Sequence, residues 1–213
     1  DTVVVVKVLR PHINHQLTRD LKLLRILATI CSTFIPGMAT FKPQEIITEI
    51  AHTLYAELDL LLEGANAAQL SRNFQAESHV HIPQIYWHYS TTKVLVMERI
   101  NGTSIQAQQQ LQQAGFSLTT LAQLAIEIFF TQVFRDNFFH ADWHPGNIFI
   151  TKNQHGHAQY SLVDFGIVGS LSSHDQRYLA ANILALIKKD YRRVAELHLA
   201  SAWLPADART DLF

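Results

Sequence analysis

The sequence is poor in cysteine and in charge. Cys31 is the only cysteine among 213 residues, which excludes a disulfide framework and a zinc finger built on cysteine. Charged residues make up 16% of the chain, below the ~25% of an average soluble domain. The formal net charge is −1, and no block of lysine or arginine stands out. These features argue against an electrostatic footprint for nucleic acid, so we expect no nucleic-acid partner.

Long hydrophobic runs are also missing. The best membrane candidate, residues 26–41, is uncharged but contains Pro36 and Gly37, and it is shorter than the ~20 residues of a typical span. No transmembrane helix is therefore expected in this sequence. The chain starts at Asp1 and opens directly on a run of valines. We expect it to be part of a longer protein.

The apolar fraction of 48% is large enough for one large domain or two small lobes, and it excludes disorder. The hydrophobic pattern alternates between strand and helix periods along the chain. We expect a buried strand over 3–9, strands over 84–89 and 93–97 that form a hairpin, and a second hairpin of 148–151 with 160–163. Helices are expected over 14–32, 43–74 with a break near Gly64, 104–113, 117–136, 173–189 and 191–200.

This order predicts an α+β fold with two lobes and a hinge near residues 97–102. Residues 1–101 would form a partial N-lobe, with a helical insertion between a strand that carries a lysine and a helix that carries a glutamate. Residues 102–213 would form a mostly helical C-lobe. The order of elements is that of a protein-kinase-like fold.

Several polar residues follow the order in which phosphoryl-transfer enzymes carry their parts. Such an enzyme needs a cation for the phosphates, an acid that holds this cation, metal ligands, and a carboxylate for the acceptor. Lys7 lies on the first strand, and Glu57 lies on a downstream helix. Asp142 precedes Asn147 with the spacing D-x-x-x-x-N, and Asp164 begins an Asp-Phe-Gly triplet that ends at Gly166.

The second hairpin explains why Asn147 and Asp164 could work together. Asn147 precedes one strand and Asp164 follows its antiparallel partner, so the two side chains should lie close together. An amide oxygen and a carboxylate suit a hard cation such as Mg²⁺. Asp142 lies in the preceding loop and could accept a proton from a hydroxyl group.

Each of these residues also has a simpler interpretation. A lone Asp-Phe-Gly triplet can be a β-turn, and Lys7 or Glu57 alone can be a surface residue. His140 and His144 have the i, i+4 spacing of a zinc pair, but Pro145 follows at once and no third ligand is suitably spaced. The ordered set as a whole favours the kinase-like site.

At these residues the chain resembles the UbiB-type atypical kinases, which are linked to ubiquinone (coenzyme Q) biosynthesis. The matching stretches are 5–11, 57–59, 63–67, 96–102, 138–147 and 162–169, and 129–136 looks like the proteobacterial branch. The resemblance covers essentially the whole chain. Its most specific part is the sequence His-Ala-Asp-x-His-Pro-Gly-Asn, which includes the family-motif positions His140 and His144.

The resemblance implies a role for each residue of the site. Lys7 and Glu57 would form the lysine–glutamate ion pair, with Asp59 completing an ExD motif. Asp142 would be the catalytic base, and Asn147 and Asp164 would bind magnesium. The hinge residues would bind the adenine of ATP through their backbone: Met97, Glu98, Arg99 and Ile100. The implied cofactors are ATP and Mg²⁺.

The resemblance also implies partners and a location. Ubiquinone-biosynthesis proteins, ubiquinone precursors and a membrane surface would be the partners, at the cytoplasmic face of the bacterial inner membrane. Ala141 replaces the usual catalytic-loop arginine, and no Ala-Pro-Glu follows Asp164. We therefore expect ATPase activity or a lipid-like acceptor rather than peptide phosphorylation. Family members carry a phosphate-covering segment upstream, so this chain alone should bind ATP weakly and be inactive.

Two other functions stay open from the sequence. A small-molecule phosphotransferase of the aminoglycoside or choline kinase type also uses H-x-D-x-x-x-x-N, although Phe165 and the ExD motif disfavour it. A non-catalytic scaffold that binds lipid or partner proteins is the third possibility. The retention of Asp142, Asn147 and Asp164 disfavours such a scaffold.

Overall fold

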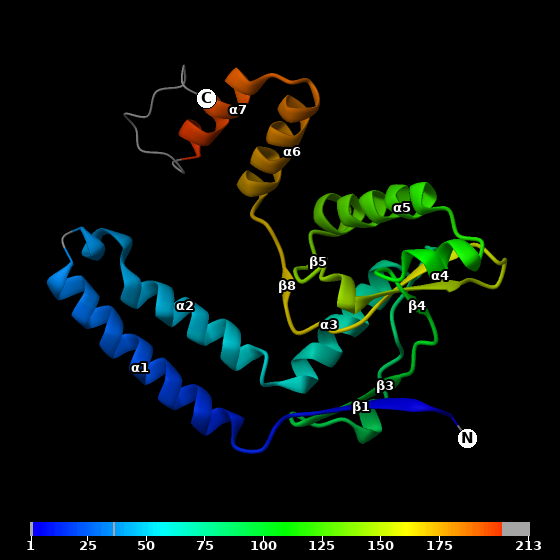
Figure 1. Cartoon of the computed structure of the whole chain (residues 1–213), viewed down its shortest axis with the longest axis horizontal. Coiled ribbons are helices and arrows are strands. Elements are labelled where there is room, and N and C mark those ends of the chain that lie inside the picture. Colours follow the sequence, from blue (N-terminus) through cyan, green and yellow to red (C-terminus); the bar gives the residue numbers. More distant parts are fainter. Residues whose placement is uncertain (1, 36, 202–213) are drawn as a thin grey trace. The chain divides into compact units, whose positions relative to one another are not determined.

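The computed structural model describes residues 2–35 and 37–201 (Figure 1). The chain divides into two compact units. The first contains residues 1–128 and 140–168, and the second contains residues 129–139 and 169–213. The lobe boundary expected after residue 101 falls inside the first unit, so it stays a prediction.

The first unit begins with a two-stranded antiparallel sheet. Strand β1 (Val4–Val8) pairs with β3 (Val94–Glu98), and Lys7 lies opposite Leu95. The expectation that the first strand is buried is wrong, because the valines of β1 are between 37% and 61% exposed. Strand β1 has only β3 as a strand neighbour among the described residues. A run of β-branched residues predicts a strand, but its burial depends on what covers it.

The expected hairpin of residues 84–89 with 93–97 is also partly wrong. Residues 84–89 contribute a single bridge from Ile85 to Met97 and then turn into the 3₁₀ helix η2 (Trp87–Tyr89). The Ser90 hydroxyl group fixes this turn, since it donates to the Tyr86 carbonyl and accepts from the Val96 N–H. The antiparallel partner of β3 is therefore β1.

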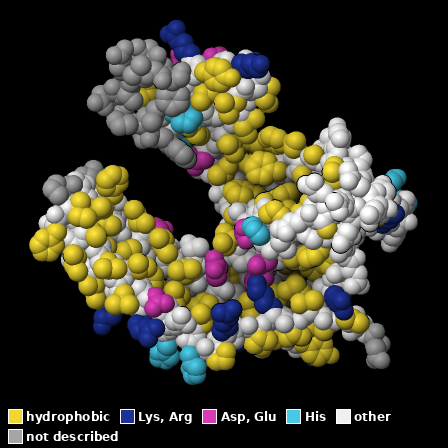
Figure 2. Space-filling view, viewed as in Figure 1, with side chains coloured by type: hydrophobic (Ala, Val, Ile, Leu, Met, Phe, Trp, Pro, Cys, Tyr) yellow, Lys and Arg dark blue, Asp and Glu magenta, His cyan; other side chains and the backbone are white. Residues whose placement is uncertain are grey.

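Helices α1 (Ile13–Phe34) and α2 (Pro43–Ala56) lie side by side in Figure 1, joined through the 3₁₀ helix η1 (Met38–Phe41). They pack through a small apolar cluster formed by Leu21, Ala28, Ile47 and Ala51, with Leu17 and Leu54 at its margin. Many apolar side chains on the two helices stay exposed, as the hydrophobic surface in Figure 2 shows; among them are Leu23, Ile26, Leu27, Ile30, Phe34, Ile46 and Ile50. No helix in the described part of the chain is both long and apolar enough to cross a membrane.

Helix α3 (Leu60–Asn73) follows α2 after a break at residues 57–59, not near Gly64 as the sequence suggested. Asp59 causes the break because its side chain accepts a hydrogen bond from the Leu61 N–H and so caps α3. Gly64 lies within α3 against Trp87 and Leu95. A Cβ atom there would lie 3.1 Å from both side chains, so glycine permits this close approach.

A second sheet of the first unit has the order β2-β7-β6-β4. Its centre is the hairpin of β6 (Ile148–Lys152) and β7 (Ala158–Leu162), which confirms the hairpin expected from the sequence. The outer strands are β2 (Val80–His81) and β4 (Thr103–Ser104). Helix α4 (Gln108–Gln113) is shorter than expected because residues 103–104 belong to β4. The hydroxyl group of buried Tyr160 donates to the Leu121 carbonyl in α5 (Leu118–Phe130).

Helix α5 leads into a six-residue π-helical segment, η3 (Thr131–Asp136), in place of one regular helix over 117–136. Asn137 follows with a positive φ of 48°. Its side chain donates to the Leu171 carbonyl and accepts from the Leu171 N–H, at 2.9 and 2.8 Å. This double hydrogen bond holds the end of η3 inside the second unit.

Two capped helices make up most of the second unit. Helix α6 (Ser173–Ile187) starts after Ser172, whose hydroxyl oxygen accepts from the Asp175 N–H, which confirms the expected cap. Helix α7 (Tyr191–Ala200) has the bounds expected from the sequence and is capped by Asp190. The two-residue strands β5 (Phe139–His140) and β8 (Val168–Gly169) complete the described elements.

Candidate active site

Lys7 is the centre of the site, and every residue of the site lies in the first unit. The Lys7 ammonium donates to both carboxylate oxygens of Glu63 at 2.9 Å and to Asp164 Oδ1 at 2.8 Å. Glu63 is only 3% exposed, whereas Lys7 and Asp164 are 39% and 47% exposed. One amine therefore joins α3 to the Asp-Phe-Gly triplet from the middle of β1.

The prediction that Glu57 is the ion-pair partner of Lys7 is wrong. Glu57 is the residue that ends α2, whereas Glu63 lies in the first turn of α3. The break at Asp59 separates the two acids, and it is α3 that carries its glutamate to Lys7. Glu57 still lines the same cavity as Lys7 and Asp164. It contributes negative charge to the site without forming the ion pair.

Burial and ion pairing act against each other in this cluster. Burial tends to lower the pKa of Lys7, but hydrogen bonds to Asp164 and Glu63 outweigh it and raise this pKa above 10.5. Burial raises the pKa of Glu63 above its usual 4.5, and the bond from Lys7 offsets this only in part. Burial also tends to raise the pKa of Asp164, but Lys7 outweighs it and holds this pKa below 3.8. Of the two acids that bind Lys7, the less buried one, Asp164, has the lower pKa.

The backbone of the Asp-Phe-Gly triplet is held in an unusual conformation. Asp164 has a φ of 65°, in the left-handed region that L-residues rarely adopt. Phe165 is fully buried, and its carbonyl accepts a hydrogen bond of 3.0 Å from the Asn66 amide of α3. A Cβ atom on Gly166 would meet nothing closer than 3.7 Å, so space alone does not require glycine there.

The loop before β6 positions Asp142 through its neighbours. The Asp142 N–H donates to Nδ1 of buried His140, so Nε2 carries the ring proton and donates to the Val163 carbonyl. The Asn147 side-chain amide donates to Asp142 Oδ2 at 3.0 Å. Because its nitrogen faces Asp142, the carbonyl oxygen of Asn147 remains available for a cation. Asp142 and Asn147 are therefore in direct contact, and Asn147 and Asp164 line one cavity, as the second hairpin suggested.

His144 has a local structural role. Its Nδ1 accepts from the Gly146 N–H and caps the short helix η4 (Pro145–Asn147), which ends at Asn147. His140 and His144 thus each use Nδ1 to accept a backbone N–H. Asp59 likewise acts on the backbone, as the cap of α3. Among the described residues, no group of three or more histidine, cysteine, aspartate or glutamate side chains is arranged to hold a metal ion.

A cavity of about 460 Å³ extends from Lys7 to the hinge. Three of the four hinge residues expected to bind adenine line this cavity: Met97 and Glu98 at the end of β3, and Ile100. The other apolar walls come from β1, from β6 and from the residue that follows β7: Val5, Val6, Phe149 and Val163. A flat, largely apolar ring with a few polar edges fits such a lining.

The Glu98 side chain is held by residues that precede β3 in the chain. Its carboxylate accepts from the Gln84 N–H at 3.1 Å and lies 3.1 Å from Nε2 of His81. The Glu98 N–H in turn donates to the Gln84 carbonyl. These contacts keep the backbone at the start of the hinge in one place.

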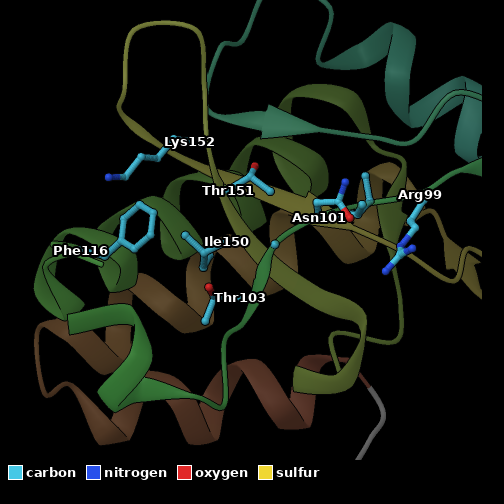
Figure 3. A pocket seen from close by; sticks show the side chains of 9 residues that line it. Arg99, Asn101, Thr103, Phe116, Ile150, Thr151 and Lys152 are labelled. Carbon is cyan, nitrogen blue, oxygen red and sulfur yellow. The ribbon is translucent and has the colours of Figure 1, made fainter. Parts of the chain in front are cut away.

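Arg99 lies on a different depression. This second cavity of about 560 Å³ lies over residues 99–103, Phe116 and the end of β6. Figure 3 shows Arg99 and Asn101 at one end and Lys152 with Phe116 at the other. The Lys152 ammonium lies 5.5 Å from the centre of the Phe116 ring. Arg99 is not among the residues that line the hinge cavity, so its contact with adenine stays a prediction.

A polar cavity of about 320 Å³ adjoins the hinge cavity, and the two share Lys7, Glu63 and Asp164. It is also lined by Glu57, Asp142, Gly166 and Ile167. Four carboxylates face one ammonium in this space. A phosphate chain would be repelled there unless cations neutralised the acids, and carboxylate and amide oxygens are the ligands that Mg²⁺ prefers. The residues present thus fit a magnesium-bound phosphate group.

Sequence reasoning missed two residues of the site. Glu63 is marked by its position in the first turn after Asp59, a residue that often caps helices. Asn66 lies one turn further along α3, and its role depends on a contact with Phe165 across 99 residues. No local pattern in the sequence could have revealed that contact.

A family model for the ABC1 atypical kinase-like domain matches residues 1–198. The chain belongs to this family. Curated relatives of the ABC1 family agree with the match. The chain is 47% identical over 210 residues to the probable protein kinase UbiB of Azotobacter vinelandii and to that of Pseudomonas fluorescens strain Pf-5. A Marinobacter nauticus protein of the same name is 46% identical. The resemblance to UbiB-type kinases found in the sequence is confirmed.

The alignments cover 99% of this chain but only 38–39% of the length of these relatives. Among solved structures, the Mycobacterium tuberculosis protein Rv3197, determined as a complex with erythromycin, has a TM-score of 0.67 and 22% identity. The alignment covers 92% of this chain and 47% of Rv3197. The ABC1 match and this neighbour confirm the expected α+β, protein-kinase-like fold. The chain is of the kinase-like class.

Proposed function

We propose that this chain is the MgATP-binding core of an atypical kinase or ATPase that supports ubiquinone biosynthesis. The observation that carries the proposal is the position of Lys7. Its ammonium bonds to Glu63 and Asp164 where the hinge cavity meets the polar cavity. A nucleotide in the first cavity would extend its phosphates into the second.

The hinge cavity accounts for recognition of the base. Adenine would lie between the apolar walls from β1 and β6 and would bind the backbone of residues 97–100. The contacts of Glu98 with His81 and Gln84 hold this backbone in position. Apolar walls with backbone donors and acceptors at one edge would exclude water from both faces of the base.

The polar cavity accounts for the phosphates. Lys7 would bind phosphate oxygens, and Glu63 would keep the ammonium in place when phosphate competes for it. Asn147 and Asp164 would hold Mg²⁺ through their oxygens, and the bound ion would neutralise charge on the phosphates. The lowered pKa of Asp164 keeps its carboxylate ionised, as a magnesium ligand must be.

Asp142 is the proposed base. Its backbone is fixed by His140, and its carboxylate by Asn147, beside the polar cavity. It would accept a proton from an acceptor hydroxyl group or from water. Only residues 165–172 separate Asp164 from α6, which leaves little chain to bind a peptide. We therefore propose water or a small lipid-like molecule as the acceptor.

The biological setting is inferred from the resemblance to UbiB-type kinases. We propose ubiquinone-biosynthesis proteins and ubiquinone precursors as partners, at the cytoplasmic face of the bacterial inner membrane. The exposed apolar side chains of α1 and α2 support contact of the whole protein with other molecules or with a bilayer.

The test uses the complete protein that contains these residues. Asp142→Asn should lower ATP turnover by about 10²–10⁴-fold, the usual contribution of a general base, and leave MgATP binding nearly unchanged. Asp164→Asn should weaken binding of MgATP. Asp20→Asn on α1, outside the site, is the control and should behave as wild type.

Complementation separates catalysis from scaffolding. Wild type should restore ubiquinone in a deficient strain, and Asp164→Asn should fail to do so. Restoration by both would contradict a catalytic role and favour the scaffold. Strong phosphorylation of a peptide library that Asp142→Asn abolishes would contradict the proposed acceptor. Transfer to an aminoglycoside or choline would favour the small-molecule phosphotransferase.

A further inference from the structure

Two side chains on one face of α3 hold the Asp-Phe-Gly triplet, which begins with the proposed magnesium ligand Asp164. Glu63 and Asn66 are three residues apart, and residues with this spacing are neighbours on a helix surface. Glu63 binds Lys7, which in turn binds Asp164 Oδ1. Asn66 binds the carbonyl of the next residue, Phe165. Helix α3 therefore holds the Asp-Phe-Gly triplet at two points, the Asp164 side chain by way of Lys7 and the Phe165 backbone directly.

The backbone at Asp164 needs such support. Its φ of 65° is a conformation that an L-residue keeps only when its surroundings require it. Phe165 is fully buried, and its ring lies 5.5 Å from that of His140, so it cannot shift freely. The Asn66 hydrogen bond fixes the orientation of the next peptide, between Phe165 and Gly166.

Asn66 itself is well placed for this role. It is 8% exposed, its helix is fixed by the Asp59 cap, and its amide is 3.0 Å from the Phe165 carbonyl oxygen. A carbonyl oxygen buried without a donor would be unfavourable, so the backbone would rotate toward another partner if the amide were removed. Such a rotation would also turn the Gly166 N–H, which belongs to the same peptide and donates a hydrogen bond to the Asp164 carboxylate.

We propose that Asn66 is a positioning residue that sets the direction of the Asp164 carboxylate for a divalent cation. The proposal rests on the MgATP function argued above. Asn66 contacts neither nucleotide nor metal; it acts through the Phe165 backbone. Its loss should raise the Mg²⁺ concentration that nucleotide binding requires, and it should affect binding of the adenine ring far less.

Asn66→Asp tests this with almost no change of shape. An ionised carboxylate has no N–H to donate and would face the Phe165 carbonyl with a second acceptor. The half-saturating Mg²⁺ concentration for nucleotide binding to the complete protein should rise about tenfold, the usual effect of one lost buried hydrogen bond. Nucleotide affinity measured in EDTA should change less than about twofold.

Asn182→Asp is the matched control. Asn182 is 7% exposed, and its amide donates to a backbone carbonyl, that of Tyr178, at 3.0 Å. It has the same residue type as Asn66, a similar burial and a bond to a backbone carbonyl, but it belongs to α6 of the second unit. Both variants should lower the melting temperature, whereas only Asn66→Asp should shift the Mg²⁺ requirement. Asn66→Ser gives the same readout if the charged variant does not fold.

The outcomes separate this inference from the function on which it rests. An unchanged Mg²⁺ requirement in folded Asn66→Asp or Asn66→Ser, with normal binding by wild type, overturns the role of Asn66 alone. An equal shift in Asn182→Asp also overturns it. Absence of Mg²⁺-dependent nucleotide binding by wild type overturns both proposals.

Discussion

The Lys7 ammonium lies 2.9 Å from both carboxylate oxygens of Glu63, which is almost fully buried in the first turn of α3. This pair connects the exposed strand β1 to a helix that packs into the core through the same face. The rest of the site is arranged around it. Asp164 completes the contact from the opposite side.

Glu63→Gln should destabilise the protein more than Glu57→Gln. The first change removes a carboxylate from a half-buried ammonium that keeps only Asp164 as a partner, and it should cost about 1–3 kcal/mol in the free energy of unfolding. Glu57→Gln removes no ion pair and should stay within about 0.5 kcal/mol. Urea denaturation of both variants measures the difference. Equal losses would contradict the assignment of Glu63 as the partner.

The pKa values of the two acids beside Lys7 should lie further apart than those of an ordinary glutamate and aspartate. Glu63 should have a pKa above 4.5 and Asp164 a pKa below 3.8. As the pH falls, Glu63 should take up its proton first, and the bond from Lys7 to Asp164 should be the last to be lost. Carbon-13 NMR of the labelled carboxyl groups measures both values. A lower pKa for Glu63 than for Asp164 would contradict this order.

These shifts have opposite effects on stability. The lowered pKa of Asp164 stabilises the fold above pH 3.8, and this contribution disappears as the pH falls through the lowered value. The raised pKa of Glu63 contributes stability below pH 4.5, and this is lost as the pH rises through the raised value. Asp164→Asn should therefore flatten the acid side of the stability profile. Glu63→Gln should abolish the loss of stability that occurs as the pH rises through the pKa of Glu63.

Asp59→Ala should destabilise α3 by about 1 kcal/mol because it removes the cap on Leu61. Asp59→Ser retains an oxygen that can accept the same N–H, so it should restore most of the stability. Thermal unfolding of the two variants tests this. If serine behaves like alanine, the Asp59 carboxylate has a role other than capping.

Gly102→Ala should destabilise the junction between the hinge and β6. A Cβ atom would lie 2.9 Å from Phe149 Cβ and 3.1 Å from the Ile150 carbonyl oxygen, neither of which can move without moving the strand. We expect a loss of about 1–3 kcal/mol, as for other overpacked sites. Asn101→Ala, at the exposed neighbouring residue, should change stability by less than about 0.5 kcal/mol. Denaturant unfolding of both variants provides the comparison.

The sequence located most of the residues that line the polar cavity but not the partner of Lys7. The order of residues along the chain matched the order in which phosphoryl-transfer enzymes carry such groups, and it identified Lys7, Asp142, Asn147 and Asp164. The hairpin of β6 and β7 could be found from its alternation and its polar turn. These signals are local, and local patterns determine which elements form.

The errors arose where a contact is set by distant residues. Glu57 and Glu63 are six positions apart, and a helix expected to break near Gly64 gave no reason to prefer Glu63. The true break depends on one capping oxygen at Asp59. The burial of β1 depends on neighbouring strands, and the role of Asn66 depends on a carbonyl 99 residues away. Periodicity contains no information about either.

The π-helical segment Thr131–Asp136 makes the spacing between α5 and the catalytic loop intolerant of deletion. Each residue of an α-helix turns the chain by about 100°, and a π turn accommodates one additional residue without that rotation. Removing one residue from η3 would restore a regular helix and rotate Asn137 away from both of its bonds to Leu171. Relatives aligned to this chain should therefore rarely have a one-residue gap between α5 and Asn137.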